Sequence, residues 1–286
     1  MTTEKNVALV LSSGGPRGYA HVGAIKALLE RGYRITSIAG TSMGALVGGI
    51  YATGHLEEME TWSRKLTRAD VLRLSDLALS TSHIIKGNKV MRALKQLAPD
   101  CDIETLPIPY CAIATDLLHS QEIVFRRGSL YDAIRASIAI PTYFAPIKRK
   151  DMLLVDGGLT NPLPLNRVAR SEGDLLVSVN VSAPNDPAIT QSLQRQRALR
   201  TSGFPTIVKR IVRKRQAINY LTLINRSIGT QIQYNAAMAL RLTPPDVSLD
   251  IPKNRFDGLD YHDAARIIDM GFDMMNATLD AYEQTR

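Results

Sequence analysis

The sequence predicts an α/β fold in which helices cover a mostly parallel β-sheet. Two short apolar runs, at residues 6–11 and 35–39, each lead through a glycine-containing turn into a helical pattern. A repeated β-turn-α unit of this kind favours parallel strands joined by helical crossovers. Two later apolar runs, in "DMLLVDGG" and "DLLVSVNV", are typical of further buried strands of the same sheet.

The remaining elements follow from the spacing of apolar residues. The first helix is predicted over residues 18–30, with Val22 and Ile25 on its buried face, and the second begins after Ser42. Further helices are expected at 56–66, at 89–97, from near Pro162, and in the closing stretch "DAARIIDMGFDMMNATLDAY"; further strands are expected at 110–115 and 122–125.

Length and composition predict one domain over residues 1–286 with a basic helical insertion around 187–230. A chain of this length with 45% hydrophobic residues can fill a sizeable core. No secretory signal pattern is recognisable, so we expect a cytoplasmic protein, in which Cys101 and Cys111 remain free thiols. Residues 35–54 carry no charge over the length of a membrane span, but their five glycines favour a strand, a turn and a small-residue helix.

The net charge of +8 is concentrated in one segment. Residues 188–244 contain ten arginines and lysines and no aspartate or glutamate, whereas the rest of the chain is close to neutral. An anionic partner should therefore meet this segment.

The first motif of interest is "SSGGPRG", which lies between the first strand and the first helix. Glycines let the backbone approach a ligand, and the start of a helix offers unpaired N–H groups and a positive dipole end. Pro16 has no N–H, so the available donors are Gly14, Gly15, Arg17 and Gly18. The motif fits either an anion site or a tight turn that merely needs small residues.

The second motif is "GTSMG", from Gly40 to Gly44, between the second strand and its helix. Small residues around a serine at this junction permit the sharp turn of a nucleophile elbow, which lifts the hydroxyl of Ser42 clear of the sheet. Alternatively, Ser42 only caps the helix. A third motif, "LLVDGGLTNPLP", places Asp156 at the end of a buried strand, and the ends of parallel strands line a common crevice.

Together and in this order, the three motifs resemble the patatin-like phospholipase family, both its bacterial members and the catalytic domain of neuropathy target esterase. The resemblance rests on "LSSGGPRGYAHVGAI", "GTSMGALVGG", "ATDLLHSQEIVFRRGSLYDAIRASIAIPTYFAPI" and "VDGGLTNPLP", and it spans most of residues 5–180. One position departs from the pattern, because members usually carry glycine where this chain has Ser13. If that position requires a positive φ, Ser13 strains the turn.

The resemblance implies a three-layer α/β/α sandwich and a serine lipid acyl hydrolase without metal or organic cofactor. Ser42 would be the nucleophile and Asp156 the general base, and an acyl-enzyme would form and be hydrolysed. The amides of Gly14 and Gly15, helped by Arg17, would form the oxyanion hole. We expect desolvation beside Ser42 to raise the pKa of Asp156 and so make it a better base.

Two other functions remain open at this point. Ser42, Asp156 and His262 have the chain order of an α/β-hydrolase triad, although few strands precede Ser42 and His262 sits where a helix begins. A protein of the same scaffold that binds a lipid or anion without turnover is the non-enzyme alternative, and Ser13 favours it. His21, near the glycine turn, has either a supporting role or a packing role. The remaining histidines lack metal-ligand spacing, and we expect no metal site.

The basic segment contains a cationic amphipathic pattern in "FPTIVKRIVRKRQAINYL". One helical face is apolar, and the other carries the candidate membrane contacts Lys209, Arg210, Arg213 and Lys214. Such a helix lies on an anionic membrane or packs its apolar face on its own core. We expect no nucleic acid partner, because no aromatic residues interleave with the charges.

Overall fold

A computed structural model describes residues 5–76, 83–85, 87–202, 220–256 and 260–285 of the chain. Within these residues, eight strands form the central sheet in the order β10-β9-β1-β2-β4-β8-β7, with β5 also paired to β4. Their bounds are β1 (Lys5–Leu11), β2 (Tyr33–Thr41), β4 (Tyr110–Asp116), β5 (Gln121–Phe125), β7 (Ile147–Arg149), β8 (Met152–Asp156), β9 (Leu175–Ala183) and β10 (Val247–Pro252). A separate pair consists of β3 (His83–Ile85) and β6 (Thr142–Phe144).

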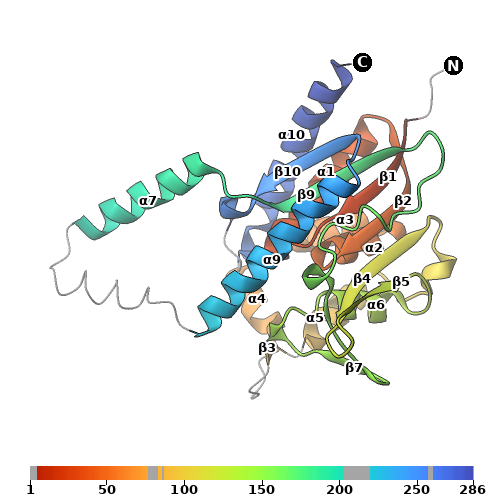
Figure 1. The fold of residues 1–286 in the computed structure, drawn as a ribbon, viewed down its shortest axis with the longest axis horizontal. Helices are drawn as coiled ribbons and strands as arrows, with labels where there is room; N and C mark the ends of the chain where they lie inside the picture. Colours follow the sequence, from red (N-terminus) through yellow and green to blue (C-terminus); the bar gives the residue numbers. More distant parts are fainter. Residues whose placement is uncertain (1–4, 77–82, 86, 203–219, 257–259, 286) are drawn as a thin grey trace.

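The helices are arranged in layers on the two faces of this sheet (Figure 1). They are α1 (Ala20–Glu30), α2 (Met43–Ala52), α3 (Leu56–Arg64), α4 (Arg68–Leu74), α5 (Asn88–Leu97), α6 (Leu130–Ser137), α7 (Pro187–Ser202), α9 (Tyr220–Leu242) and α10 (Ala264–Glu283). Short 3₁₀ turns include η1 (Gly15–Tyr19), η3 (Gly157–Leu159), η4 (Lys253–Arg255) and η5 (Tyr261–Asp263). In Figure 1, α7 projects away from the sheet.

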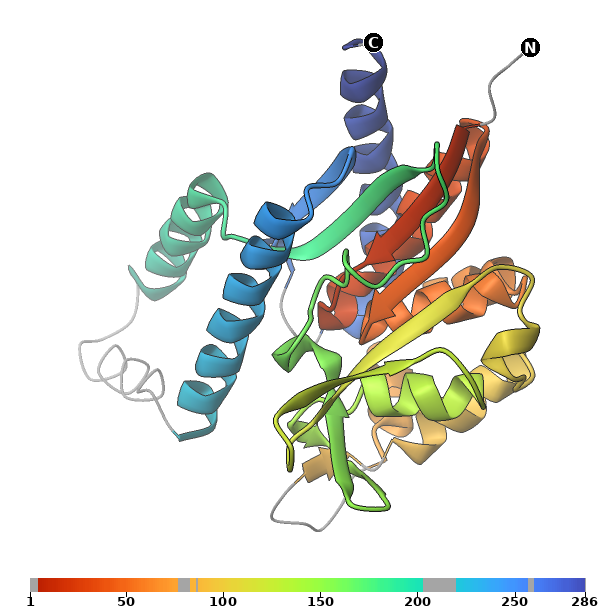
Figure 2. The same cartoon turned by 45° about the vertical axis from the view of Figure 1, so that its right-hand side comes forward.

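Successive side chains of β1 point to opposite faces of the sheet and so pack into the two halves of the core. Val7, Leu9 and Leu11 pack with apolar side chains of α1, α2 and α10. Ala8 and Val10 point to the opposite face, where they pack with a second group that includes Ala236 of α9. Figure 2 shows α9 and α10 on opposite sides of the sheet. The three-layer α/β/α architecture predicted from the sequence is therefore confirmed, and its sheet is mostly parallel.

The pairing of β4 places two chain segments end to end. Its residues pair in parallel with β2 up to Thr41 opposite Ile113, and antiparallel with β8 from Asp156 opposite Ala114. Because β5 occupies one edge of β4, β2 and β8 must share the other edge. The end of β2 and the end of β8 therefore meet at consecutive residues of β4.

The contact between α1 and α10 depends on two glycines. A Cβ atom on Gly23 would lie 2.0 Å from the carbonyl oxygen of Ile268, and one on Gly271 would lie 2.3 Å from the carbonyl oxygen of Ala20. The two helix backbones thus touch, which fixes the start of α1 against the C-terminal helix.

The helix predicted from near Pro162 is wrong. After η3, residues 161–170 form turns and irregular backbone. Pro162 and Pro164 explain the error, because each lacks an N–H for a helical hydrogen bond and disfavours helical backbone in the residue before it. Cys101 and Cys111 are unbridged, as predicted. No helix among the described residues is long and apolar enough to span a membrane.

Candidate active site

Ser42 occupies a sharp turn between β2 and α2. Its backbone has φ 56° and ψ −121°, a left-handed conformation that is costly for a residue with a side chain. A Cβ atom on Gly40 would lie 2.5 Å from the carbonyl carbon of Gly44, and one on Gly44 would lie 2.2 Å from the carbonyl oxygen of Leu11. The small residues around Ser42 are therefore required, because backbone packs against backbone on both sides of the turn.

Ser137, at the end of α6, holds this turn from the other side. Its hydroxyl accepts a hydrogen bond from the backbone N–H of Ser42 at 2.8 Å and donates one to the carbonyl oxygen of Ile113 at 2.6 Å. The turn is thus tied to β4, the strand that also pairs with β8. Ser137 lies within "SIAIP", where no local sequence pattern indicates a role for it.

Asp156 lies beside Ser42 at the end of β8. The hydroxyl of Ser42 donates a hydrogen bond to Oδ2 of Asp156, and the N–H of Gly158 donates one to Oδ1 at 2.7 Å. Both side chains are buried, with 3% of Ser42 and 5% of Asp156 exposed. Burial raises the pKa of Asp156 to about 6, against the opposing effect of these two hydrogen bonds. The carboxylate is thus oriented toward the serine and is more basic than a free aspartate.

The glycine turn faces the same space. Gly15 has φ 56°, and Gly14 packs so closely on β9 that a Cβ atom there would lie 2.2 Å from Cγ2 of Val181. Among the described residues, no acceptor is hydrogen-bonded to the N–H of Gly14 or of Gly15. Gly18 lies one turn further on, where a Cβ atom would collide with the side chain of Met43. The turn therefore combines unpaired donors with backbone that tolerates no side chains.

Ser13 does not strain this turn, because the positive φ falls on Gly15 instead. The backbone of Ser13 is held by three hydrogen bonds: its N–H donates to the carbonyl oxygen of Pro162 at 2.8 Å, and its carbonyl oxygen accepts from the hydroxyls of Ser182 at 2.8 Å and Ser12 at 3.1 Å. Its own hydroxyl is buried and has no partner among the described residues. The departure at Ser13 thus leaves the shape of the turn unaffected.

Two basic residues of the first helical segment support the turn. Nε of Arg17 donates to the carbonyl oxygen of Val181 at 2.8 Å, and burial lowers the pKa of Arg17 to about 10, so its charge persists at neutral pH. Nε2 of His21 lies 2.9 Å from the carbonyl oxygen of Ser12. Burial lowers the pKa of His21 to about 4, so the ring is neutral and donates to that carbonyl. His21 thus braces the residue that precedes the glycine turn.

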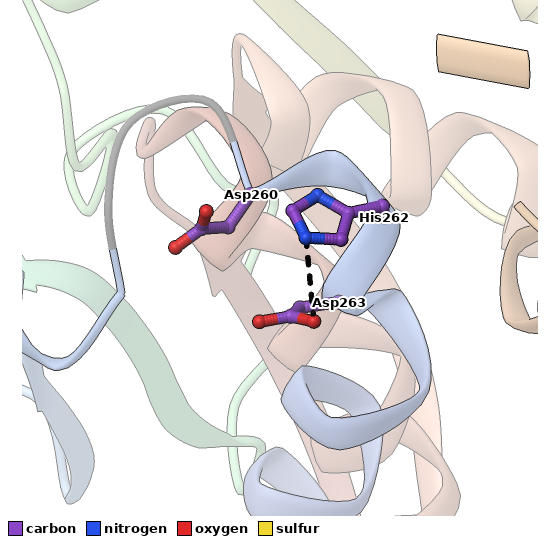
Figure 3. Close-up of side chains that lie close together, drawn as sticks. All are labelled: Asp260, His262 and Asp263. Carbon is purple, nitrogen blue, oxygen red and sulfur yellow. Dashed lines mark ion pairs between the residues drawn. The ribbon is translucent and has the colours of Figure 1, made fainter. Parts of the chain in front are cut away.

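His262 does not line the cavity that contains Ser42 and Asp156. Figure 3 shows it with Asp260 and Asp263 just before α10, where one possible metal-ligand atom from each residue lies within 4.8 Å of the others. Nε of Arg68 donates to Nε2 of His262 at 3.0 Å, and Nε2 lies 3.7 Å from Asp263. These contacts account for His262 as part of a half-buried polar cluster. It does not line the space around Ser42, so the geometry does not build a Ser-Asp-His triad.

A cavity of about 150 Å³ opens beside Ser42 and Asp156. One wall is the glycine turn from Ser13 to Arg17, and another is formed by Ile140 and Pro141 after α6. The third wall comes from α9 and from η4, which contribute Ile228, Gly229, Ile232 and Lys253. This third wall was not anticipated from the sequence, because neither segment carries a recognisable motif.

The proposed membrane contacts cannot be placed in the site. Lys209, Arg210, Arg213 and Lys214 lie in residues 203–219, outside the described part of the chain. The same holds for the middle of the expected insertion at 187–230, whose flanks are α7 and the first half of α9.

This chain is similar to several known proteins. Residues 9–169 match the family model described as patatin-like phospholipase. An uncharacterized NTE family protein of Mycobacterium tuberculosis is 33% identical over 336 aligned residues, covering 99% of this chain and 93% of that protein. Neuropathy target esterase sws of Drosophila melanogaster is 30% identical over 195 residues, covering 66% of this chain and 14% of the fly protein. The solved structure of VipD from Legionella pneumophila aligns with a TM-score of 0.47 and 15% sequence identity, over 98% of this chain and 67% of VipD.

Proposed function

The chain belongs to the patatin-like phospholipase family, and from this premise we propose that it is a serine lipid acyl hydrolase that cleaves carboxylic esters with a Ser42–Asp156 dyad. The observation that carries the proposal is the hydrogen bond from the hydroxyl of Ser42 to Oδ2 of Asp156. This pair lines a cavity that the glycine turn also lines. A phospholipid, a lysophospholipid, a monoglyceride or a simple ester each presents the bond that such a site attacks.

The proposed reaction runs through an acyl-enzyme. Ser42 Oγ attacks the ester carbonyl while its proton passes to Asp156, and the carbonyl oxygen becomes negatively charged. In this proposal the N–H groups of Gly14 and Gly15, which have no acceptor among the described residues, donate to that oxygen, and the charge of Arg17 adds to the favourable potential. Asp156 then returns the proton to the departing alcohol. In the second half, water attacks the acyl carbon while Asp156 accepts its proton. Asp156 then returns this proton to Ser42 Oγ as the carboxylic acid leaves.

The test is covalent labelling with a fluorophosphonate probe. We expect the wild-type protein to be labelled and Ser42→Ala to remain unlabelled. Asp156→Asn should be labelled at least 100-fold more slowly, a magnitude within the range typical of loss of a general base. Thermal unfolding of each variant serves as the control for folding. Failure of the folded wild-type protein to react would favour the non-enzyme alternative, a protein that binds a lipid or anion on the same scaffold.

That alternative loses its main support in the geometry of the turn. It rested on Ser13 distorting the glycine turn, and the positive φ lies at Gly15 instead. The raised pKa of Asp156 also supports turnover, because carboxyl groups whose pKa is raised by burial gather at catalytic sites.

For the basic segment we propose peripheral binding to an anionic membrane surface, with the protein otherwise cytoplasmic. Two observations support this. The helix that follows the segment, α9, begins with Tyr220 78% exposed and Leu223 53% exposed. The same helix lines the cavity two turns later through Ile228 and Ile232. Exposed apolar side chains on a helix that lines the cavity, directly after a basic segment in the sequence, suit a lipid interface.

Flotation with vesicles tests this proposal. We expect binding to phosphatidylglycerol vesicles that weakens as salt rises and is lost when Lys209, Arg210, Arg213 and Lys214 are changed to Gln. Phosphatidylcholine vesicles are the control. Binding that is insensitive both to salt and to the four substitutions would contradict an electrostatic membrane contact.

A further inference from the structure

Lys253 is a cation in the wall of the candidate active site. It follows β10 at the start of η4, is half-buried, and lines the cavity together with Arg17, Ser42 and Asp156. Among the described residues, neither Lys253 nor Arg17 forms an ion pair with an acidic side chain. A half-buried ammonium group without a counterion is unfavourable unless something else supplies the negative charge.

Gly229 of α9 provides the space that Lys253 occupies. A Cβ atom on Gly229 would lie 2.5 Å from Nζ of Lys253, closer than two such atoms can approach. The ammonium group thus lies against the helix at a position where almost any other residue would displace it. Glycine is also less favourable than alanine in a helix interior, so its presence is consistent with a need for this space.

The charges around the cavity are unbalanced. Among the described residues, Asp156 is the one acidic residue in the cavity lining, and its carboxylate already accepts hydrogen bonds from Ser42 and Gly158. Burial lowers the pKa of Lys253, and the positive charge of Arg17 lowers it further. An anion between them would relieve both effects.

We propose that Lys253 and Arg17 bind a phosphate group carried by the ester substrate, and that Lys253 thereby makes the enzyme prefer phosphate-bearing esters to neutral glycerides. The proposal rests on the ester hydrolase function proposed above and specifies its substrate class. Phosphate matches the site because its several oxygens can be shared by an arginine and a lysine that approach from different walls. Lys253 is then a specificity-determining residue outside the dyad and the glycine turn.

Binding to a protein without its nucleophile tests the subsite independently of turnover. In the Ser42→Ala background, calorimetry would compare octyl phosphate, octanol and inorganic phosphate. We expect octyl phosphate to bind more tightly than either of the others, and Lys253→Met to weaken its binding about tenfold, the size of a lost charge-assisted hydrogen bond. Lys253→Arg should retain most of the affinity. Unchanged binding of octyl phosphate to Lys253→Met would overturn the subsite, and inorganic phosphate binding as tightly as octyl phosphate would overturn its assignment to a lipid substrate.

Kinetics then test the consequence for specificity with one acyl chain on two substrates, 1-lauroylglycerol 3-phosphate and 1-lauroylglycerol. We expect the ratio of their kcat/KM values to fall about tenfold in Lys253→Met, mainly through the KM of the phosphate ester. Gly229→Ala should lower the ratio while it raises the stability of α9, because it moves the ammonium group without removing it. Lys148→Met, which removes an exposed lysine of β7, is the control and should behave as wild type.

The outcomes separate the two proposals. If Ser42 reacts with the fluorophosphonate and both esters are hydrolysed with the same ratio in wild type and Lys253→Met, the hydrolase function stands and the phosphate subsite is wrong. If Ser42 does not react, but octyl phosphate binding depends on Lys253, the subsite stands and the hydrolase function is wrong.

Discussion

A single residue, Asp156, determines the lowest pH at which the proposed hydrolase keeps its full activity. Its carboxyl group must be ionised to accept the proton of Ser42, and burial raises its pKa to about 6. We therefore expect kcat/KM to fall tenfold for each pH unit below about 6, whereas a solvent-exposed aspartate would allow activity to persist to about pH 4. The measurement is a pH-rate profile with a neutral ester, so that only the enzyme titrates. A limb that begins near pH 4 would show that Asp156 is not desolvated in the working enzyme.

Ser42 itself is strained, and strain at one residue can be measured by substitution. Its positive φ costs on the order of 1–3 kcal/mol for any residue with a Cβ atom. Ser42→Gly should therefore be more stable than Ser42→Ala by about 1 kcal/mol. This is the reverse of the usual order, in which a protein with alanine is more stable than one with glycine at the same position. Urea unfolding of both inactive variants gives the difference directly. If Ser42→Ala is the more stable of the two, the turn is not strained in solution.

At the scale of the element, α2 contains a matched pair of glycines with different surroundings. A Cβ atom on Gly44 would lie 2.2 Å from the carbonyl oxygen of Leu11, whereas one on Gly49 would lie 3.1 Å from the flexible ends of Ile134 and Leu130. Backbone cannot move aside as side chains can, so Gly44→Ala should cost at least about 3 kcal/mol of stability and Gly49→Ala less than about 1 kcal/mol. Denaturant unfolding checks the stability of both, and probe labelling should be lost only in Gly44→Ala. Equal effects would show that α2 shifts freely against β1.

The helices and strands also show which parts of the fold can be predicted from the sequence. The strands that end at Leu11 and Thr41 and the helices that follow them were predicted because the apolar run, the turn residues and the helical pattern are all local. The prediction of a helix from near Pro162 was wrong because Pro162 and Pro164 lack the N–H groups that a helix requires beyond its first turn. Ser137, Gly229 and Lys253 were missed because each reaches the site through contacts between segments far apart in the chain, which no local pattern records.

For the whole molecule, the C-terminal helix is coupled to the glycine turn. Gly271 of α10 touches the backbone of Ala20, the residue that directly follows the 3₁₀ turn bearing Gly15 and Arg17. Gly271→Ala should therefore lower the rate of probe labelling as well as stability, the latter by about 2–3 kcal/mol. Asp273→Ala, an exposed change on the same helix, is the control and should alter neither. Labelling at the wild-type rate in a destabilised Gly271→Ala protein would show that the turn is independent of α10.

The shared edge of β4 has a consequence for how this protein can be assayed. Thr41 and Asp156 lie opposite neighbouring residues of that strand. A slip of β8 by a single position would turn the carboxyl group toward the other surface of the sheet. A chain that misfolded in this way would have the same mass and a nearly normal helix content and solubility, but it would have no hydrolase activity. Burst titration of Ser42 therefore counts the molecules in a preparation whose strands have found their proper alignment, which circular dichroism cannot do.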